Sequence, residues 1–294
     1  MTRLFRTSKN LLITAAVLAL MTAATAQARA DGTPVDLHYV AVGVSKVPSL
    51  PANNQLRFAH KDAQDLAKAW ETQKGGLYHD VRGEVLTDEN ATVANILAAL
   101  DRLEQRAHKG DTAVVSFAGH GAFVGSRYTS WFFVAHDFDM NRVNETSVME
   151  GTLKDQLSRL AKNGVTVILV LDTCNSGVFN ANGTGVVVLA ACSSNEFSFE
   201  DDSFQNGVFT RALLEALQGK ADANNDGVIT LAEIEAYLSM RVAEIHTSIN
   251  ATDQNGQRVT QNPTYSRPSS ILHNLALASG AAQPPVQEQQ RWRN

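Results

Sequence analysis

The sequence predicts an α/β domain whose central sheet is mainly parallel and has about six strands. Two apolar runs, within residues 111–121 and at residues 165–171, carry this prediction. Neither run shows the alternation of a half-exposed strand, so both are expected to be buried on both faces of a sheet. Segments with helical spacing separate the strand runs, and this strand-helix order predicts a parallel sheet with right-handed crossovers.

The elements follow from local patterns along the chain. Phe58, Leu66 and Trp70 recur on one face of residues 57–73, which predicts a helix that ends at Gly75 and Gly76. Further helices are expected at 92–107, 149–161, 209–217 and 231–248, and strands at 37–44, 81–86, 128–134 and 186–191. A short last element at 271–277 has no clear type, and residues 278–294 have the composition of a disordered tail.

Composition and charge exclude several classes of protein. The chain has 294 residues, of which 44% are hydrophobic, and this is enough for one sizeable domain. The formal net charge of -5 carries no long block of one sign, which argues against a nucleic-acid or anionic-membrane surface. The 2 cysteines exclude a disulfide framework. Neither an organic cofactor nor a second subunit is expected.

The first 30 residues have the organisation of a cleaved signal peptide. Arg3, Arg6 and Lys9 precede an apolar run at 11–26, and the small residues Ala28 and Ala30 follow it. The run is short and rich in alanine for a membrane span, although a retained anchor is the alternative. We therefore expect a mature domain of residues 31–277 in the periplasm or outside the cell, with no membrane segment once the signal peptide is removed.

Two reactive side chains stand at the ends of the two buried strands. Cys174 follows the run at 165–171, and His120 lies between Gly119 and Gly121, where nothing bulky surrounds it. Chemistry in open α/β sheets is located beyond the carboxyl ends of the strands. A cysteine nucleophile needs a base or cation beside it to ionise near neutral pH. The pair is therefore predicted to form a catalytic dyad, and the sequence indicates no third orienting residue.

Four segments make the chain resemble the caspase and metacaspase family of cysteine peptidases across residues 36–248. They are LRFAHKDA at 56–63, SFAGHG at 116–121, DTCNSG at 172–177 and GVFTRAL at 207–213. The histidine also precedes the cysteine, as in caspases. The resemblance implies a three-layer sandwich and a cysteine endopeptidase. The backbone N–H groups of Cys174 and Gly121 are then the natural donors to the oxyanion.

The same resemblance implies a preference for basic substrates. Asp172 lies two residues before Cys174, so strand alternation places both on one side. In metacaspases the matching aspartate binds the arginine or lysine before the cleaved bond, and an acidic pocket would reject an aspartate there. The alternative is that Asp172 only caps the neighbouring turn. A protein or peptide with a basic residue at the cleavage site is the expected partner.

Asp62 and three departures from the family pattern complete the predicted cleft. Asp62 matches a family aspartate that helps to line the pocket, although a solvated helix carboxylate is the alternative. His60 and Lys61 replace the usual small and amide residues before it. Ala118 lacks a hydroxyl that metacaspases carry near the pocket, and Asn175 replaces the usual histidine after the cysteine. These departures leave room for a non-catalytic caspase-like module that binds peptides or partner proteins.

Residues 222–233 match the pattern of an EF-hand calcium loop. The residues at the ligand positions and at the glycine position are Asp222, Asn224, Asp226, Gly227 and Glu233, and Val228 would offer its carbonyl. The loop has no partner EF-hand, so a structural connector is the alternative to a calcium site. A second, weaker set of calcium candidates, which also fits a solvated flexible loop, is Glu200, Asp201 and Asp202.

The remaining cysteine and one further histidine are interpreted as structural. Cys192 ends the strand at 186–191 and reads as a small buried residue, with a redox pair to Cys174 as the alternative. A thiol oxidoreductase is disfavoured because no Cys-x-x-Cys motif occurs. His136 follows the strand at 128–134 and is expected to support the fold.

Overall fold

The computed structural model describes residues 27, 32–124, 130–252 and 258–280, so all but one residue of the expected signal peptide and most of the expected tail lie outside the described residues. Its centre is a six-stranded sheet. The strands run, in spatial order, β12 (Thr264–Ser266), β8 (Val186–Ala190), β7 (Thr166–Thr173), β3 (Thr112–Gly119), β1 (Leu37–Gly43) and β2 (Val81–Thr87). Only the edge strand β12 is antiparallel to its neighbour. The predicted mainly parallel α/β sheet is confirmed.

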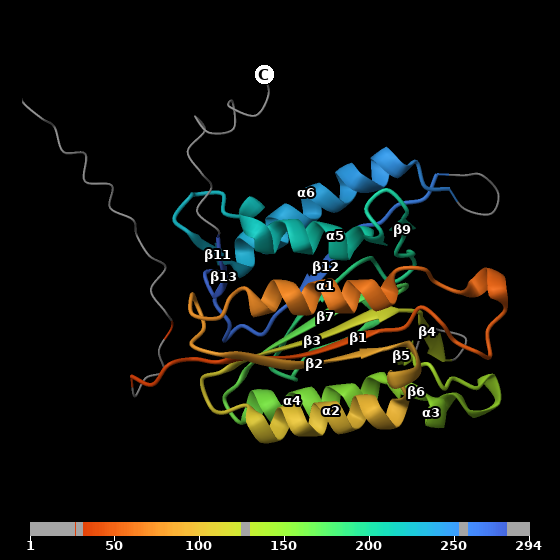
Figure 1. Ribbon diagram of the computed structural model, residues 1–294, viewed down its shortest axis with the longest axis horizontal. Helices are drawn as coiled ribbons and strands as arrows, with labels where there is room; N and C mark the ends of the chain where they lie inside the picture. The colour runs from red at the N-terminus through yellow and green to blue at the C-terminus, as the bar shows by residue number, and fades with distance from the viewer. Residues whose placement is uncertain (1–26, 28–31, 125–129, 253–257, 281–294) are drawn as a thin grey trace, which may run out of the picture.

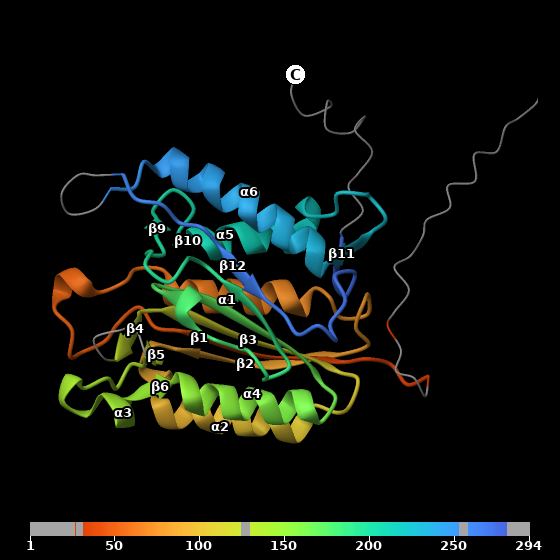
Figure 2. The same cartoon turned by 180° about the vertical axis from the view of Figure 1, so that it is seen from behind.

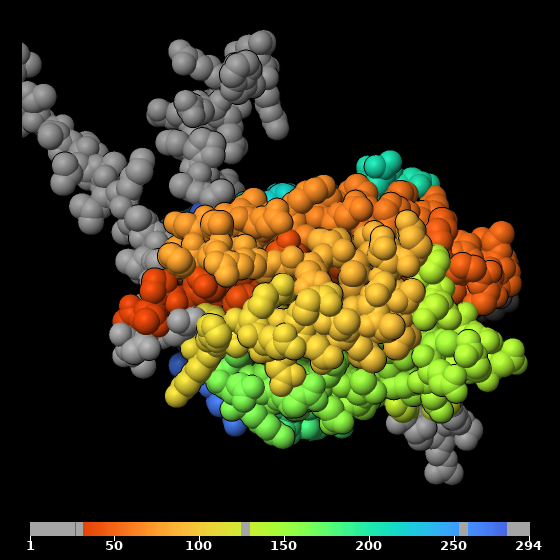
Figure 3. All heavy atoms as spheres, turned by 60° about the horizontal axis from the view of Figure 1, so that its bottom comes forward, coloured from red at the N-terminus to blue at the C-terminus, as the bar shows by residue number. Residues whose placement is uncertain are grey.

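Helices cover both faces of the sheet and make three layers (Figures 1 and 2). The upper layer of Figure 1 holds α1 (Ala59–Glu71), α5 (Val208–Glu215) and α6 (Leu231–Ile249). The lower layer holds α2 (Val93–Arg106) and α4 (Glu150–Lys162), which lie side by side in the space-filling view of Figure 3. Alternate residues of each strand face opposite layers, so the sheet separates two hydrophobic cores.

Shorter strands and one short helix lie outside the central sheet and its covering helices, and several of them were not predicted. They are the sheet of β4 (Gly121–Val124), β5 (Ser130–Val134) and β6 (Ser147–Met149), the helix α3 (Val143–Thr146), and the strand pairs β9 (Glu200–Asp201) with β10 (Asn206–Gly207) and β11 (Val228–Thr230) with β13 (Ala276–Ser279). The last segment, whose type was open, therefore contains a strand. The acidic loop that was expected to be flexible contains β9. No helix within the described residues is long and apolar enough to cross a membrane.

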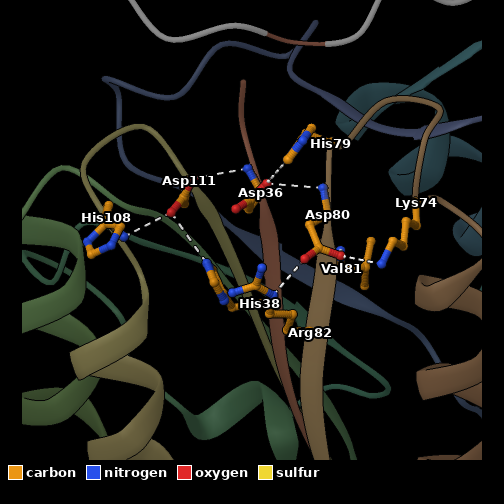
Figure 4. Close-up of polar contacts among 9 residues, drawn as sticks. All are labelled: Asp36, His38, Lys74, His79, Asp80, Val81, Arg82, His108 and Asp111. Atoms are coloured by element: carbon orange, nitrogen blue, oxygen red, sulfur yellow. Dashed lines mark hydrogen bonds and ion pairs between the residues drawn. The ribbon is translucent and has the colours of Figure 1, made fainter. Parts of the chain in front are cut away.

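Carboxylates join the amino ends of three neighbouring strands (Figure 4). The Asp111 carboxylate accepts the Asp36 N–H at 3.0 Å and lies 3.3 Å from His38 Nε2. The Asp36 carboxylate in turn accepts the Asp80 N–H at 3.0 Å and lies 3.0 Å from His79 Nδ1. These contacts link the segments that begin β1, β2 and β3. Contacts of these side chains therefore hold the amino ends of the three strands together. The candidate catalytic residues lie at the opposite, carboxyl edge of the sheet.

Candidate active site

The strands β3 and β7 bring the two predicted catalytic side chains to one edge of the sheet. They are parallel neighbours, and Gly119 at the end of β3 pairs with Thr173 at the end of β7. His120 and Cys174 come directly after this pair, and both line the same pocket of about 60 Å³. Because the ends of the two strands are in register, side chains far apart in the sequence meet at the carboxyl edge, beside β4 in Figure 1.

His120 is oriented by a backbone carbonyl. Its Nε2 lies 2.7 Å from the carbonyl oxygen of Asn54, at the end of a 3-10 turn formed by Ala52–Asn54. A carbonyl oxygen only accepts hydrogen bonds, so Nε2 donates this bond, and in the neutral ring Nδ1 therefore carries the lone pair of a base. The sequence could not have indicated the Asn54 carbonyl as the group that orients His120, because this carbonyl belongs to the main chain of a loop and no side-chain pattern encodes its position.

Cys174 sits at a sharp turn that opens toward the pocket. The next residue, Asn175, adopts a left-handed conformation with φ of 57°, which asparagine tolerates better than most residues. Its side-chain amide donates to the Ser194 carbonyl at 3.0 Å and fixes the turn. Burial raises the pKa of the Cys174 thiol, and the nearby Asp172 raises it further, while a hydrogen bond from the Ser198 backbone lowers it. The free site therefore favours the neutral thiol.

Asp172 lies in the same pocket and is almost completely buried. One carboxylate oxygen accepts the Ser198 hydroxyl at 2.5 Å, and the other accepts the Thr210 hydroxyl at 2.6 Å and its N–H at 3.0 Å. Ala118 is the register partner of Asp172 on β3, so the hydroxyl missing there would have lain beside this carboxylate. Ser198 and Thr210 supply hydroxyl donors from other segments. Burial raises the pKa of Asp172 despite these donors.

Asp62, in the first turn of α1, is the second acid of the pocket. Its carboxylate accepts the Asn206 amide at 2.8 Å and the Gly207 N–H at 3.1 Å, and only 2% of the residue is exposed. Burial raises the pKa of Asp62 well above its ordinary value, and the proximity of Asp172 adds to the rise. Asp62 is therefore a buried pocket residue and not a solvated helix carboxylate.

Glu200 is a third pocket acid, which the sequence analysis had assigned only to the weaker calcium set. Its carboxylate accepts the N–H groups of Arg57 and Phe58, both at 2.9 Å, at the start of α1. Asp202 instead pairs with the Arg57 guanidinium at 2.6 Å, outside the pocket. The position of Glu200 depends on the path of the chain after β8, and no sequence pattern around it indicates that path.

Gly121, the predicted second oxyanion donor, begins β4 and packs against the nucleophile's own turn. A Cβ built on it would lie 2.6 Å from the Cys174 carbonyl oxygen and 2.7 Å from both Thr173 Oγ1 and Trp131 Nε1. Only glycine lets the two chain segments approach this closely. The backbone of Gly121 is therefore held directly against that of Cys174.

The EF-hand-like loop lies away from this pocket, where β11 pairs with β13 (Figure 1). Asp222 accepts the N–H groups of Asp226 at 3.1 Å and Gly227 at 3.0 Å, and Glu233 accepts those of Ala223 at 3.2 Å and Thr230 at 2.9 Å. Strand β13 occupies the side on which a partner EF-hand would pair. Across the described parts of the chain, no group of three or more His, Cys, Asp or Glu residues is placed to hold a metal ion.

The two remaining candidates lie outside the pocket. Cys192 is fully buried, and its thiol contacts the carbonyl oxygens of Thr173 at 3.4 Å and Glu196 at 3.3 Å. Both cysteines are free in this structure. The His136 ring contacts the Lys46 carbonyl oxygen at 2.7 Å, which joins two loops.

The fold and the site together define a class of protein: an α/β domain with a cysteine and a histidine at the carboxyl edge of its sheet. The caspase domain family matches residues 40–272, and the chain therefore belongs to this family of caspase-like cysteine peptidases. The resemblance seen in the sequence is confirmed. No curated protein matches the chain.

Two solved structures support the fold. A protein of Geobacter sulfurreducens has a TM-score of 0.58 at 17% identity, covering 83% of this chain and 98% of its own. Caspase-1 of Spodoptera frugiperda has a TM-score of 0.55 at 14% identity, covering 84% of this chain and 90% of its own. At these identities the likeness concerns the fold alone.

Proposed function

We propose that the chain is a cysteine endopeptidase of metacaspase type that cleaves after arginine or lysine. One observation carries the proposal: three carboxylates, those of Asp62, Asp172 and Glu200, line the pocket that also holds His120 and Cys174. No lysine or arginine lines this pocket in the described structure. A guanidinium or ammonium group suits such a pocket, and a substrate aspartate would be repelled.

The reaction uses the dyad and two backbone donors. His120 Nδ1 takes the thiol proton, and Cys174 Sγ attacks the carbonyl carbon of the scissile peptide. The N–H groups of Cys174 and Gly121 stabilise the oxyanion. His120 then protonates the leaving nitrogen as the C–N bond breaks, which leaves a thioester. Water hydrolyses the thioester, releasing the carboxylic acid and restoring the thiol.

Binding of a basic substrate side chain changes the protonation of the carboxyl groups in this pocket. In the free enzyme, burial favours the protonated forms of Asp62 and Asp172 because it raises both pKa values. A bound guanidinium supplies the missing positive charge and favours the ionised carboxylates. Ionisation of the pocket is therefore linked to the arrival of a basic side chain.

Calcium and location complete the proposal. We propose that Ca2+, when bound by residues 222–233, has a structural role, because this loop lies at the β11–β13 pair, far from the carboxyl edge in Figure 1. In this structure the carboxylates of Asp222, Asp226 and Glu233 accept backbone N–H groups, so they would have to turn toward the ion to provide charged oxygen ligands. We also propose that the mature enzyme works as a monomer in the periplasm or outside the cell, on the basis of the predicted signal peptide.

The test is an assay of the chain from Asp31 with fluorogenic peptides that end in Arg, Lys or Asp, with calcium or with a chelator. Cleavage after Arg and Lys, abolished in Cys174→Ala and weakened in Asp172→Asn, would support the proposal. Cleavage after Asp alone would refute the acidic pocket. Failure of folded, reduced protein to cleave any peptide would favour the non-catalytic peptide-binding module, which Cys174→Ala binding measurements would then examine.

A further inference from the structure

Three polar atoms lie where a side chain of residue 121 would be, next to the glycine that the proposed mechanism uses as an oxyanion donor. The position that a Cβ of Gly121 would occupy lies 2.6 Å from the Cys174 carbonyl oxygen, 2.7 Å from Thr173 Oγ1 and 2.7 Å from Trp131 Nε1. They come from the end of β7 and from β5. These atoms therefore form the wall against which the Gly121 backbone rests.

Two of these atoms are buried polar groups without a hydrogen-bond partner in the described structure. They are Trp131 Nε1 and Thr173 Oγ1, and both residues are fully buried. A buried donor or hydroxyl that has lost water and gained no partner destabilises the folded state, so such groups are rare in native proteins. Both of these lie beside the nucleophile's turn, where a cost in stability can serve catalysis.

The indole of Trp131 is unpartnered although it is firmly held. Its ring packs edge-on against Phe179, with the ring centroids 5.8 Å apart. Its backbone N–H donates to a carboxylate oxygen of Glu150 at 3.0 Å, and the other oxygen of Glu150 accepts the Asn180 N–H at 3.2 Å. The packing and the backbone hydrogen bond thus fix the Trp131 ring, with Nε1 beside Gly121.

We propose that Trp131 and Thr173 are positioning residues for the oxyanion site, an inference that rests on the proposed peptidase function. In the substrate complex the Trp131 indole N–H donates to Thr173 Oγ1, and the Thr173 hydroxyl donates to the Cys174 carbonyl oxygen. This relay gives a partner to both of the buried side-chain atoms that lack one in the free protein. It fixes the Cys174 main chain against Gly121, so that both oxyanion donors face one point when negative charge develops.

The relay acts in the transition state more than in the ground state, so its loss should lower kcat and leave KM nearly unchanged. A positioning group acts through the donors, so we expect a smaller effect than loss of a donor itself, roughly a tenfold decrease in kcat. Trp131→Phe keeps the ring and removes only the N–H. Thr173→Val removes the hydroxyl, and Thr173→Ser keeps it.

Trp70→Phe is the matched control. Trp70 is also buried and its Nε1 also lacks a partner in the described structure, but it lies in the last turns of α1, far from the pocket. Removal of an unpaired N–H should affect the melting temperature similarly at both positions. Only the Trp131 variant should change kcat.

The experiment measures kcat, KM and melting temperature with an arginine peptide, together with the inhibition constant of a peptide aldehyde ending in arginine. The aldehyde adds to Cys174 Sγ and places an oxyanion in the site. We expect Trp131→Phe and Thr173→Val to lower kcat and to weaken aldehyde binding by roughly tenfold at unchanged KM, with Thr173→Ser near wild type.

Each other outcome has a distinct meaning. Unchanged kcat and aldehyde affinity in folded Trp131→Phe would overturn the positioning role and leave the peptidase proposal intact. A decrease in kcat in Trp131→Phe that only equals the decrease in Trp70→Phe would show a general structural effect and would also overturn the positioning role. A wild-type protein that neither cleaves the peptide nor binds the aldehyde would refute the proposed function itself.

Discussion

If the pocket binds a basic side chain as proposed, its acids link substrate binding to pH. Burial raises the pKa values of Asp62 and Asp172, so protonated carboxyl groups persist to a higher pH than in water. An arginine side chain prefers the ionised pocket. Its affinity should therefore rise as the pH rises through the raised pKa values, and fall as the pH is lowered.

We expect the Kd of an arginine peptide for Cys174→Ala to decrease severalfold between about pH 5 and about pH 8. The inactive variant separates binding from the ionisation needed for catalysis. The same peptide with citrulline, a neutral isostere of arginine, is the control and should show a nearly flat profile. Isothermal titration calorimetry measures both, and parallel profiles for the two peptides would contradict the argument.

Gly207 separates the two buried carboxylates and should not tolerate a side chain. Its N–H donates to Asp62, and a Cβ built on it would overlap Asp172 Oδ2 and lie 3.2 Å from Asp62 Oδ2. We expect Gly207→Ala to reduce kcat/KM for arginine peptides roughly a hundredfold, because the pocket acids must move. Gly151→Ala has nothing within 4 Å of its Cβ, lies in α4 and should retain full activity. Equal activity of the two variants would refute this role.

The sequence located the site residues that end regular strands, and it missed those that depend on loops. His120 and Cys174 could be placed together because buried runs end at both residues and parallel strands share an edge. Glu200 and the Asn54 carbonyl reach the site through irregular segments, whose path no periodicity encodes. Local pattern thus predicts chemistry at strand ends and stops where the chain leaves regular structure.

At the scale of elements, the start of α6 depends on one reciprocal cap. The Thr230 side chain accepts the Glu233 N–H at 3.3 Å, and the Glu233 carboxylate accepts the Thr230 N–H at 2.9 Å, which forms a capping box. Thr230 also ends β11, so the cap joins the helix to the β11–β13 pair. This glutamate is the last residue of the EF-hand-like loop.

We expect Thr230→Ala to lower the free energy of unfolding by about 1 kcal/mol, because the Glu233 N–H loses its acceptor and the Glu233 carboxylate loses the Thr230 hydroxyl as a donor. Thr247→Ala in the same helix removes only an exposed hydroxyl that bonds to the Ala243 carbonyl at 2.7 Å, and should change stability by less than ~0.5 kcal/mol. Urea denaturation measures both. Similar decreases in the free energy of unfolding at the two positions would mean that the capping box does not stabilise the domain.

The EF-hand-like loop also marks a limit of prediction for elements. Its glycine and turn residues gave the correct local shape, since Gly227 has a φ of 81°. Its partner could not be predicted, because β13 is a short strand of small residues far along the chain, and Ile229 pairs there with Ala278. Helices with an apolar stripe were found, whereas two- and three-residue strands were not, because their stability comes from tertiary pairing.

For the whole molecule, the two edges of the sheet have different roles. The carboxyl edge holds the candidate catalytic pocket, whose described lining includes the carboxyl groups of Asp62, Asp172 and Glu200 and no lysine or arginine. The amino edge holds the paired groups of Figure 4, where His38 and Asp111 are 3% and 1% exposed. We therefore expect the carboxyl edge to bind a ligand and the amino edge to contribute to stability.

This division predicts how stability depends on pH. Burial lowers the pKa of His38, and the Arg106 charge lowers it further, although Asp111 and Asp36 oppose the shift. The folded protein therefore binds a proton on His38 less readily than the unfolded chain, whose histidine has a pKa of about 6.5. The contribution of neutral His38 is complete above that pH and is lost as the pH falls below it.

We expect the melting temperature of the wild-type domain to fall between about pH 7.5 and about pH 5.5 more steeply than that of His38→Gln, which cannot titrate. Other groups titrate equally in both proteins, so the difference isolates His38. His79→Gln is the control, since this exposed histidine belongs to the same cluster and contacts Asp36 at 3.0 Å. Its slope should stay steeper than that of His38→Gln, because His79→Gln retains His38. A wild-type slope no steeper than that of His38→Gln would mean that the amino edge accommodates the protonated ring, through Asp111 and Asp36, and would assign the acid sensitivity of the fold to other groups.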